Sequence, residues 1–139
     1  MSLSVMHPLP ARQLLRDVAD REFLVLGSTS VYRGYNAVTG YIIPYMAQGY
    51  AWCVGHIRIT DDAGALNLHV HQCVEDHTVV VAPPGINFGH VIYTSTFNVV
   101  AGTPFYWKVA VVSKALYLEF ENEDRTDVNI WVDAFFRND

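Results

Sequence analysis

The stretch Ala65-Leu-Asn-Leu-His-Val-His-Gln-Cys73 decides the fold class. Its apolar side chains Leu66, Leu68 and Val70 alternate with polar ones, which is the period-2 pattern of a β-strand with one buried face. The stretch Ala115-Leu-Tyr-Leu-Glu-Phe-Glu121 alternates in the same way. Two such strands predict a sheet with one face on a core and the other in water.

Outward from these stretches, short β-rich runs separated by Gly, Pro, Asn and Asp continue from Glu22 to the end of the sequence. The runs on either side of Ser95 could be two strands or one bent strand. Turn signals recur roughly every eight to twelve residues, a spacing that favours a sandwich or barrel. We therefore expect an all-β domain of about 8–10 strands.

A short helix is predicted near the N-terminus, because Leu14, Leu15 and Val18 recur at helical spacing among charged residues. The ten residues before it are too short to form their own core. Their apolar side chains are Leu3, Val5, Met6 and Leu9. We expect residues 1–21 to form an arm and this helix, and residues 22–139 to form the β-domain.

Composition excludes several classes of partner. The 139 residues fit one domain, and a net charge of −5 with only two lysines gives no basic surface for nucleic acid. The N-terminus lacks a secretory leader, and the uncharged stretches are interrupted by Pro, Asn and Gly, so we expect synthesis in the cytoplasm and no membrane contact. Cys53 and Cys73 are too few for a disulfide framework, and we expect two packed thiols.

His69 and His71 form the most suggestive candidate site, because residues two apart on a strand present their side chains on one face and could share a metal ion. With Glu75, then Pro83-x-Gly85 and His90, the pattern resembles the cupin family, which implies a metal-dependent enzyme. The second motif, however, follows only eleven residues after His71. The simpler interpretation is the wet face of a strand, so we expect no metal, no cofactor and no enzyme. The candidates of the cupin-like alternative are His69, His71, Glu75, His77 and His90.

Other motifs in the sequence are weaker evidence for a functional site. The carboxylates from Glu119 to Asp127 suggest calcium, but they lack the EF-hand order, and a solvated hairpin is the simpler account. Cys53 and His56 lie three apart and face opposite sides of a strand, so they do not form a catalytic pair.

Exposed aromatic rings could stack on sugars, although such rings also fill β-cores and interfaces. The alternative function is therefore a carbohydrate-binding module, and its candidate residues are Tyr106, Trp107 and Trp131.

Charged side chains are sparse between Phe23 and Thr60, where only Arg33 and Arg58 occur. A small monomer usually needs more surface charge, so we expect other copies to cover part of this surface. The expected state is a homo-oligomer, with three copies favoured. The expected partner-binding residues are Leu3, Val5, Met6, Leu9, Leu14 and Leu15.

The run from Phe97 to Val109, followed by Ala115 to Phe120, resembles the strand, Ala-Gly-Thr turn and strand of small jelly-roll modules. With the arm, it is similar to tailed-phage capsid decoration proteins and fibre-head domains. The resemblance implies a jelly-roll-like body and a non-enzymatic virion protein that decorates a capsid or fibre through its arm.

Overall fold

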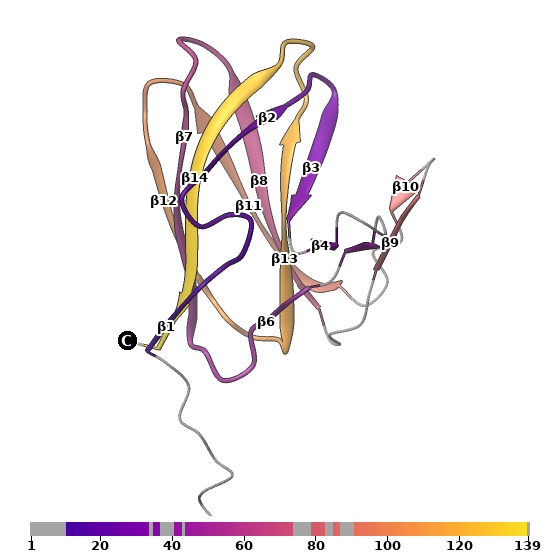
Figure 1. The fold of residues 1–139 in the computed structure, drawn as a ribbon, viewed down its shortest axis with the longest axis vertical. Helices are drawn as coiled ribbons and strands as arrows, with labels where there is room; N and C mark the ends of the chain where they lie inside the picture. The colour runs from indigo at the N-terminus through magenta and orange to yellow at the C-terminus, as the bar shows by residue number, and fades with distance from the viewer. Residues whose placement is uncertain are drawn as a thin grey trace, which may run out of the picture.

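The computed structural model of the chain describes residues 11–33, 35–36, 41–42, 44–73, 79–82, 85–86 and 91–138. Their regular structure is all β, and two antiparallel sheets face each other as a sandwich (Figure 1). No helix occurs in these residues, and so none that could cross a membrane.

The first sheet has the order β1-β14-β7-β12, and β2 pairs with β14 beside β1. Its strands are β1 (Arg12–Leu14), β2 (Arg21–Val25), β7 (Trp52–Ile59), β12 (Phe105–Ala110) and β14 (Val128–Arg137).

The second sheet has the order β11-β8-β13-β3, and β6 pairs with the start of β13. Its strands are β3 (Thr29–Arg33), β6 (Tyr45–Met46), β8 (Ala65–Cys73), β11 (Val91–Val100) and β13 (Ala115–Asn122). β11 is one strand across Ser95, with an irregularity between Val91 and Tyr93.

A third group of short strands lies beside the sandwich in the order β10-β9-β5-β4 (Figure 1). These strands are β4 (Tyr35–Asn36), β5 (Tyr41–Ile42), β9 (Val79–Ala82) and β10 (Gly85–Ile86).

The pairing of the eight long strands is nested. β2 pairs with β14, β3 with β13, β7 with β12, and β8 with β11. The first strand of this set therefore pairs with the last, and the fourth with the fifth. The eight strands therefore have the topology of one long hairpin that is folded into two layers.

The predicted alternation is confirmed in both deciding stretches. Leu66, Leu68 and Val70 are buried on β8, and the apolar positions of β13 are buried beside them. The first sheet supplies the other half of the core with Cys53, Ile57, Trp107, Ile130, Val132 and Phe136. Cys53 and Cys73 are both buried free thiols, as expected.

Close packing inside the first sheet depends on one glycine. Gly55 is the register partner of Trp107 on β12, and the Trp107 indole lies over its Cα. A Cβ at this position would overlap the ring. Glycine therefore lets a 3% exposed tryptophan fill the interior.

The predicted N-terminal helix is wrong. Residues 12–14 are β1, and Leu15 N–H donates to Ala134 O at 3.0 Å, which continues the contact with β14. The chain then turns, with Asp17 and Asp20 at positive φ. Leu15 and Val18 are buried, as a helix would also have buried them, but hydrogen bonds to the sheet override the local helical spacing.

Candidate functional site

The outward side of the second sheet carries an ordered group of polar side chains. They come from the alternate positions of β8, β11 and β13 that point away from the core. We call this group the polar ladder; its members are His69, His71, Thr94, Thr96, Glu119 and Glu121.

His69 uses both ring nitrogens. Its Nδ1 lies 2.8 Å from Thr96 Oγ1, and its Nε2 lies 2.8 Å from Glu121 Oε1. Thr96 is its register partner on β11, and Glu121 lies diagonally across on β13. The ring is therefore held from both neighbouring strands.

His71 repeats this arrangement one step along the strand. Its Nδ1 lies 2.9 Å from Thr94 Oγ1, and its Nε2 lies 2.8 Å from Glu119 Oε1. The two imidazole rings stack at 5.7 Å between centroids. The repeat follows from the two-residue period of the strands.

Glu119 is the most enclosed carboxylate of the ladder. Ser30 and Tyr32 on β3 donate to its Oε2 at 2.7 and 3.1 Å. Burial by itself would raise the pKa of Glu119, but hydrogen bonds from His71 and Ser30 outweigh it and hold that pKa below its ordinary value. Glu119 is therefore ionised at neutral pH.

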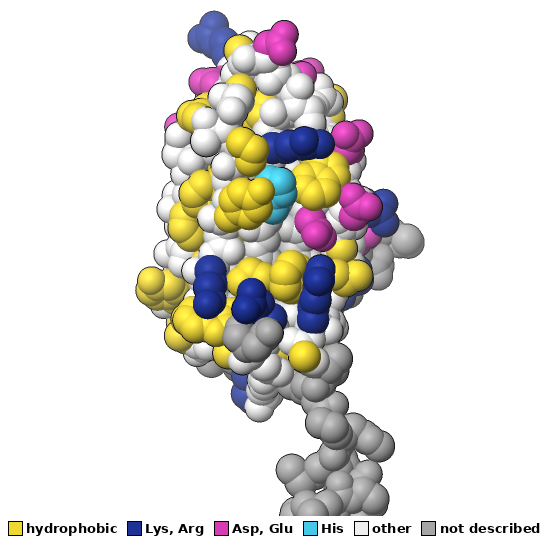
Figure 2. All heavy atoms as spheres, turned by 90° about the vertical axis from the view of Figure 1, so that its left-hand side faces the viewer, with side chains coloured by type: hydrophobic (Ala, Val, Ile, Leu, Met, Phe, Trp, Pro, Cys, Tyr) yellow, Lys and Arg dark blue, Asp and Glu magenta, His cyan; other side chains and the backbone are white. Residues whose placement is uncertain are grey.

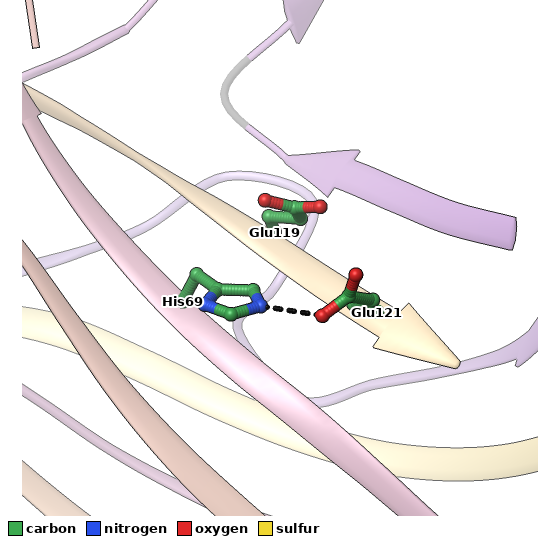
Figure 3. A group of neighbouring side chains, drawn as sticks. All are labelled: His69, Glu119 and Glu121. Atoms are coloured by element: carbon green, nitrogen blue, oxygen red, sulfur yellow. Dashed lines mark hydrogen bonds and ion pairs between the residues drawn. The ribbon is translucent and has the colours of Figure 1, made fainter. Parts of the chain in front are cut away.

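Three donor groups of the ladder converge. One ligand atom each of His69, Glu119 and Glu121 lie within 4.8 Å of one another. Figure 3 shows the imidazole on β8 facing the Glu121 carboxylate on β13, with Glu119 beside it. Imidazole and carboxylate donors in one place can hold a cation or exchange protons.

Two of the five predicted metal candidates, His69 and His71, lie in the ladder, whereas Glu75, His77 and His90 fall outside the described residues. The sequence placed Glu119 and Glu121 in an acidic hairpin and did not connect them with the histidines. Their alternation with Leu118 and Phe120 was the available signal, and pairing of β8 with β13 was the missing step.

The outward side of the first sheet is built differently, from rings and cations. Tyr106 stacks on His56 at 4.3 Å between centroids and 8° between planes, and Trp131 meets the other side of that imidazole edge-on at 5.1 Å. We call these three residues the aromatic face. Figure 2 shows the histidine between hydrophobic side chains, with Lys and Arg side chains above and below.

The aromatic face changes the list of sugar-stacking candidates. Tyr106 is 72% exposed and Trp131 is half-buried, so both reach the surface. Trp107 lies in the core and is closed to a ligand. His56 replaces it, and Arg58 lies over the Trp131 ring at 5.3 Å.

A third surface lies at the end of the sandwich where β8 and β12 finish and β13 begins. Tyr93 is the register partner of Gln72, and Val112 N–H donates to Gln72 Oε1 at 2.8 Å. Four large apolar side chains are exposed around this point. We call them the apolar end; they are Met46, Ile92, Tyr93 and Val112.

The predicted arm meets the sandwich at the same end. Asn138 N–H donates to Ala11 O, and Ala51, beside that terminus, accepts a hydrogen bond from Val111 N–H. Of the predicted partner-binding residues, Leu14 is 57% exposed and Leu15 is buried. The others, Leu3, Val5, Met6 and Leu9, fall outside the described residues.

Comparisons with known proteins find a likeness in structure but none in sequence. No family model and no curated protein matches the chain. The crystal structure of the Yersinia pseudotuberculosis-derived mitogen (YPM) is similar with a TM-score of 0.45 and 11% sequence identity, over 88% of each chain.

Proposed function

We propose that the chain is a non-catalytic virion protein, made in the host cytoplasm, whose jelly-roll body decorates a capsid or forms a fibre head as a homo-oligomer of three copies. The nested pairing of eight strands supports the jelly roll, a fold used by viral capsid and lectin domains. Of the three surfaces described above, the apolar end is the one that we assign to attachment.

The apolar end is the observation that carries this proposal. Its four side chains are between 49% and 61% exposed, and they come from three segments that pairing brings next to Gln72 and Ala115. Grouped apolar exposure of this kind is typical of a protein–protein contact. Ala11, the first described residue of the predicted arm, lies at the same end. The proposed attachment surface therefore combines the arm and the apolar end.

Charge separates this end from the opposite one. The turns at the opposite end carry the carboxylates Asp61, Asp62, Glu123, Asp124 and Asp127. The described charges beside the apolar end include Arg12, Lys114 and Arg137, which are cationic. An acidic end remains in water more readily than an apolar one, so the polarity supports attachment through the apolar end.

Light scattering on the purified full chain tests the assembly. We expect a homo-oligomer at micromolar concentration, and we expect Y93S/V112S to dissociate it while V100S, at the opposite end, leaves it intact. A wild-type protein that is strictly monomeric would overturn the assembly. If V100S dissociated the oligomer to the same extent, the contact would not lie at the apolar end.

Deleting residues 1–10 tests the arm, because this deletion leaves β1 and the buried Leu15 in place. We expect the truncated protein to keep its unfolding midpoint and to lose binding to native particles stripped of this subunit. Full binding by the truncated protein would eliminate the arm from the attachment.

A carbohydrate-binding function is the second candidate, and the aromatic face favours it. Sugars stack on flat aromatic surfaces, and Tyr106 offers the ring side that is turned away from His56. Trp131 Nε1 donates to Asp20 Oδ1 at 3.1 Å, so a polar group lies beside the rings as sugar recognition requires.

Tryptophan fluorescence titrated with a glycan panel tests this candidate. We expect a shift that Y106A abolishes and Y93A, an equally simple loss of an exposed ring at the apolar end, retains. No shift at millimolar sugar, or equal loss in both variants, would remove the candidate.

A further inference from the structure

We propose that His69, Glu119 and Glu121 bind one divalent transition-metal ion of the Zn²⁺ type on the outward side of the second sheet. The ion would be held by His69 Nε2 and one oxygen of each carboxylate. This set lies outside the sandwich core, and it is not the ligand set that the sequence suggested.

The distances are close to those of a bound ion. Nitrogen and oxygen ligands lie about 2.0–2.2 Å from Zn²⁺, so two of them are at most about 4.4 Å apart. The three ligand atoms already lie within 4.8 Å of one another. The Glu121 side chain, 33% exposed, has room to make the small movement that coordination requires.

The surroundings hold the ligands in place. The other nitrogen of His69 contacts Thr96 Oγ1, as the second nitrogen of a metal-bound histidine contacts a neighbouring polar group. Ser30 and Tyr32 hold one oxygen of Glu119, and Asn67 Nδ2 lies 3.5 Å from Glu121 Oε1. Each proposed ligand therefore has a polar partner from a different residue.

The proton balance is simple. A neutral imidazole carries one N–H, and in the ion-bound form this proton is on Nδ1 of His69, where Thr96 Oγ1 accepts it, while the Nε2 lone pair faces the ion. If Nε2 carries the proton before binding, exchange with solvent moves it to Nδ1, and no net proton is gained or lost by the ring. No bond to carbon changes and no electron moves.

Donor chemistry selects the class of ion. Imidazole nitrogen is typical of Zn²⁺, Cu²⁺, Fe²⁺ and Ni²⁺ sites, whereas Ca²⁺ and Mg²⁺ take oxygen ligands with larger or octahedral shells. One imidazole and two carboxylates therefore favour a Zn²⁺-type ion over Ca²⁺.

Calorimetric titration of untagged full-length protein with Zn²⁺ tests the site. We expect one ion per chain, affinity lowered at least tenfold by H69A and by E121Q, and lowered about tenfold by T96V, which removes only the contact to the ring. The matched control is E22Q, an exposed strand carboxylate on the first sheet, and it should bind as the wild type does.

Circular dichroism checks that each variant is folded. If H69A does not fold, E121Q and T96V, which change more exposed residues, still test the site. Absence of Zn²⁺ binding by the wild type would overturn the proposal. So would unchanged affinity in folded E121Q, an equal loss in E22Q, or preference for Ca²⁺ over Zn²⁺.

Discussion

The two outward faces of the sandwich place histidines in the same backbone setting and use them differently. His56 on β7 and His69 on β8 both lie in mid-strand with side chains directed away from the core. His56 lies between the rings of Tyr106 and Trp131. His69 is bonded through both nitrogens to Thr96 and Glu121.

The difference comes from the neighbouring strands. The register partner of His56 on β12 is Tyr106, and that of His69 on β11 is Thr96. Cross-strand pairs are the unit of interaction on a sheet surface. The contacts of each histidine are therefore set by a residue that is distant in sequence. Tyr106 is 50 positions from His56, and Thr96 is 27 positions from His69.

The largest expected effect is in the core, on the inward side of the sheet that carries the aromatic face. G55A places a methyl group against the Trp107 indole, and we expect it to lower the free energy of unfolding by about 3 kcal/mol. Urea unfolding measures the loss. G55A/W107F should recover part of it, and a G55A protein as stable as the wild type would contradict the packing.

Replacing one histidine on each face measures the contrast directly. H71A leaves the buried Glu119 without its charge-assisted hydrogen bond, and we expect a loss of about 2 kcal/mol. H56A removes ring contacts and should cost about 1 kcal/mol. Urea unfolding of both variants gives the comparison, and a larger loss for H56A would reverse the interpretation of the two faces.

The two thiols sharpen the comparison of the sheets. Burial raises the pKa of Cys53 to about 12 and that of Cys73 to about 11, so neither thiol is appreciably ionised at neutral pH. Cys53 faces the main core, while Cys73 packs with Ala115 and Tyr117 on the other side of its sheet. Because Cys73 lies outside the main core, we expect iodoacetamide to label it faster than Cys53, as followed by peptide mass spectrometry. Equal rates would show that one global opening exposes both.

The smallest expected effect separates stability from recognition. Tyr106 is 72% exposed, so Y106A should change the free energy of unfolding by less than about 0.5 kcal/mol. Thermal unfolding beside the glycan titration checks both properties on one sample. A large destabilisation would mean that the ring stack is structural.

Sequence reasoning reached the fold class because the signal was local. The alternation of Leu66, Leu68 and Val70 with polar residues predicted both the strand and its buried side. The N-terminal helix failed because Leu14, Leu15 and Val18 fit a helical period equally well, and only pairing with β14 decides against it. A single segment does not contain that pairing.

The candidate sites show the same limit. His69 and His71 were identified from their spacing, but Glu119 and Glu121 join them only through the register of β8 and β13. Tyr106 and Trp107 are neighbours in sequence and alternate across the strand, so one is on the surface and the other is in the core. Trp107 is the one that faces inward, where Gly55 on the neighbouring strand leaves room for its indole.

The antiparallel pairing of β1 with the end of β14 has a mechanical consequence. Arg12 is opposite Arg137, and Ala11 is bonded to Asn138, so residues 11 and 138 lie side by side. A force that pulls these two points apart acts on the hydrogen bonds between the strands one at a time, as in a zipper, and not on all of them together. Tension applied there would peel β1 away at low load while β7 and β2 still hold β14.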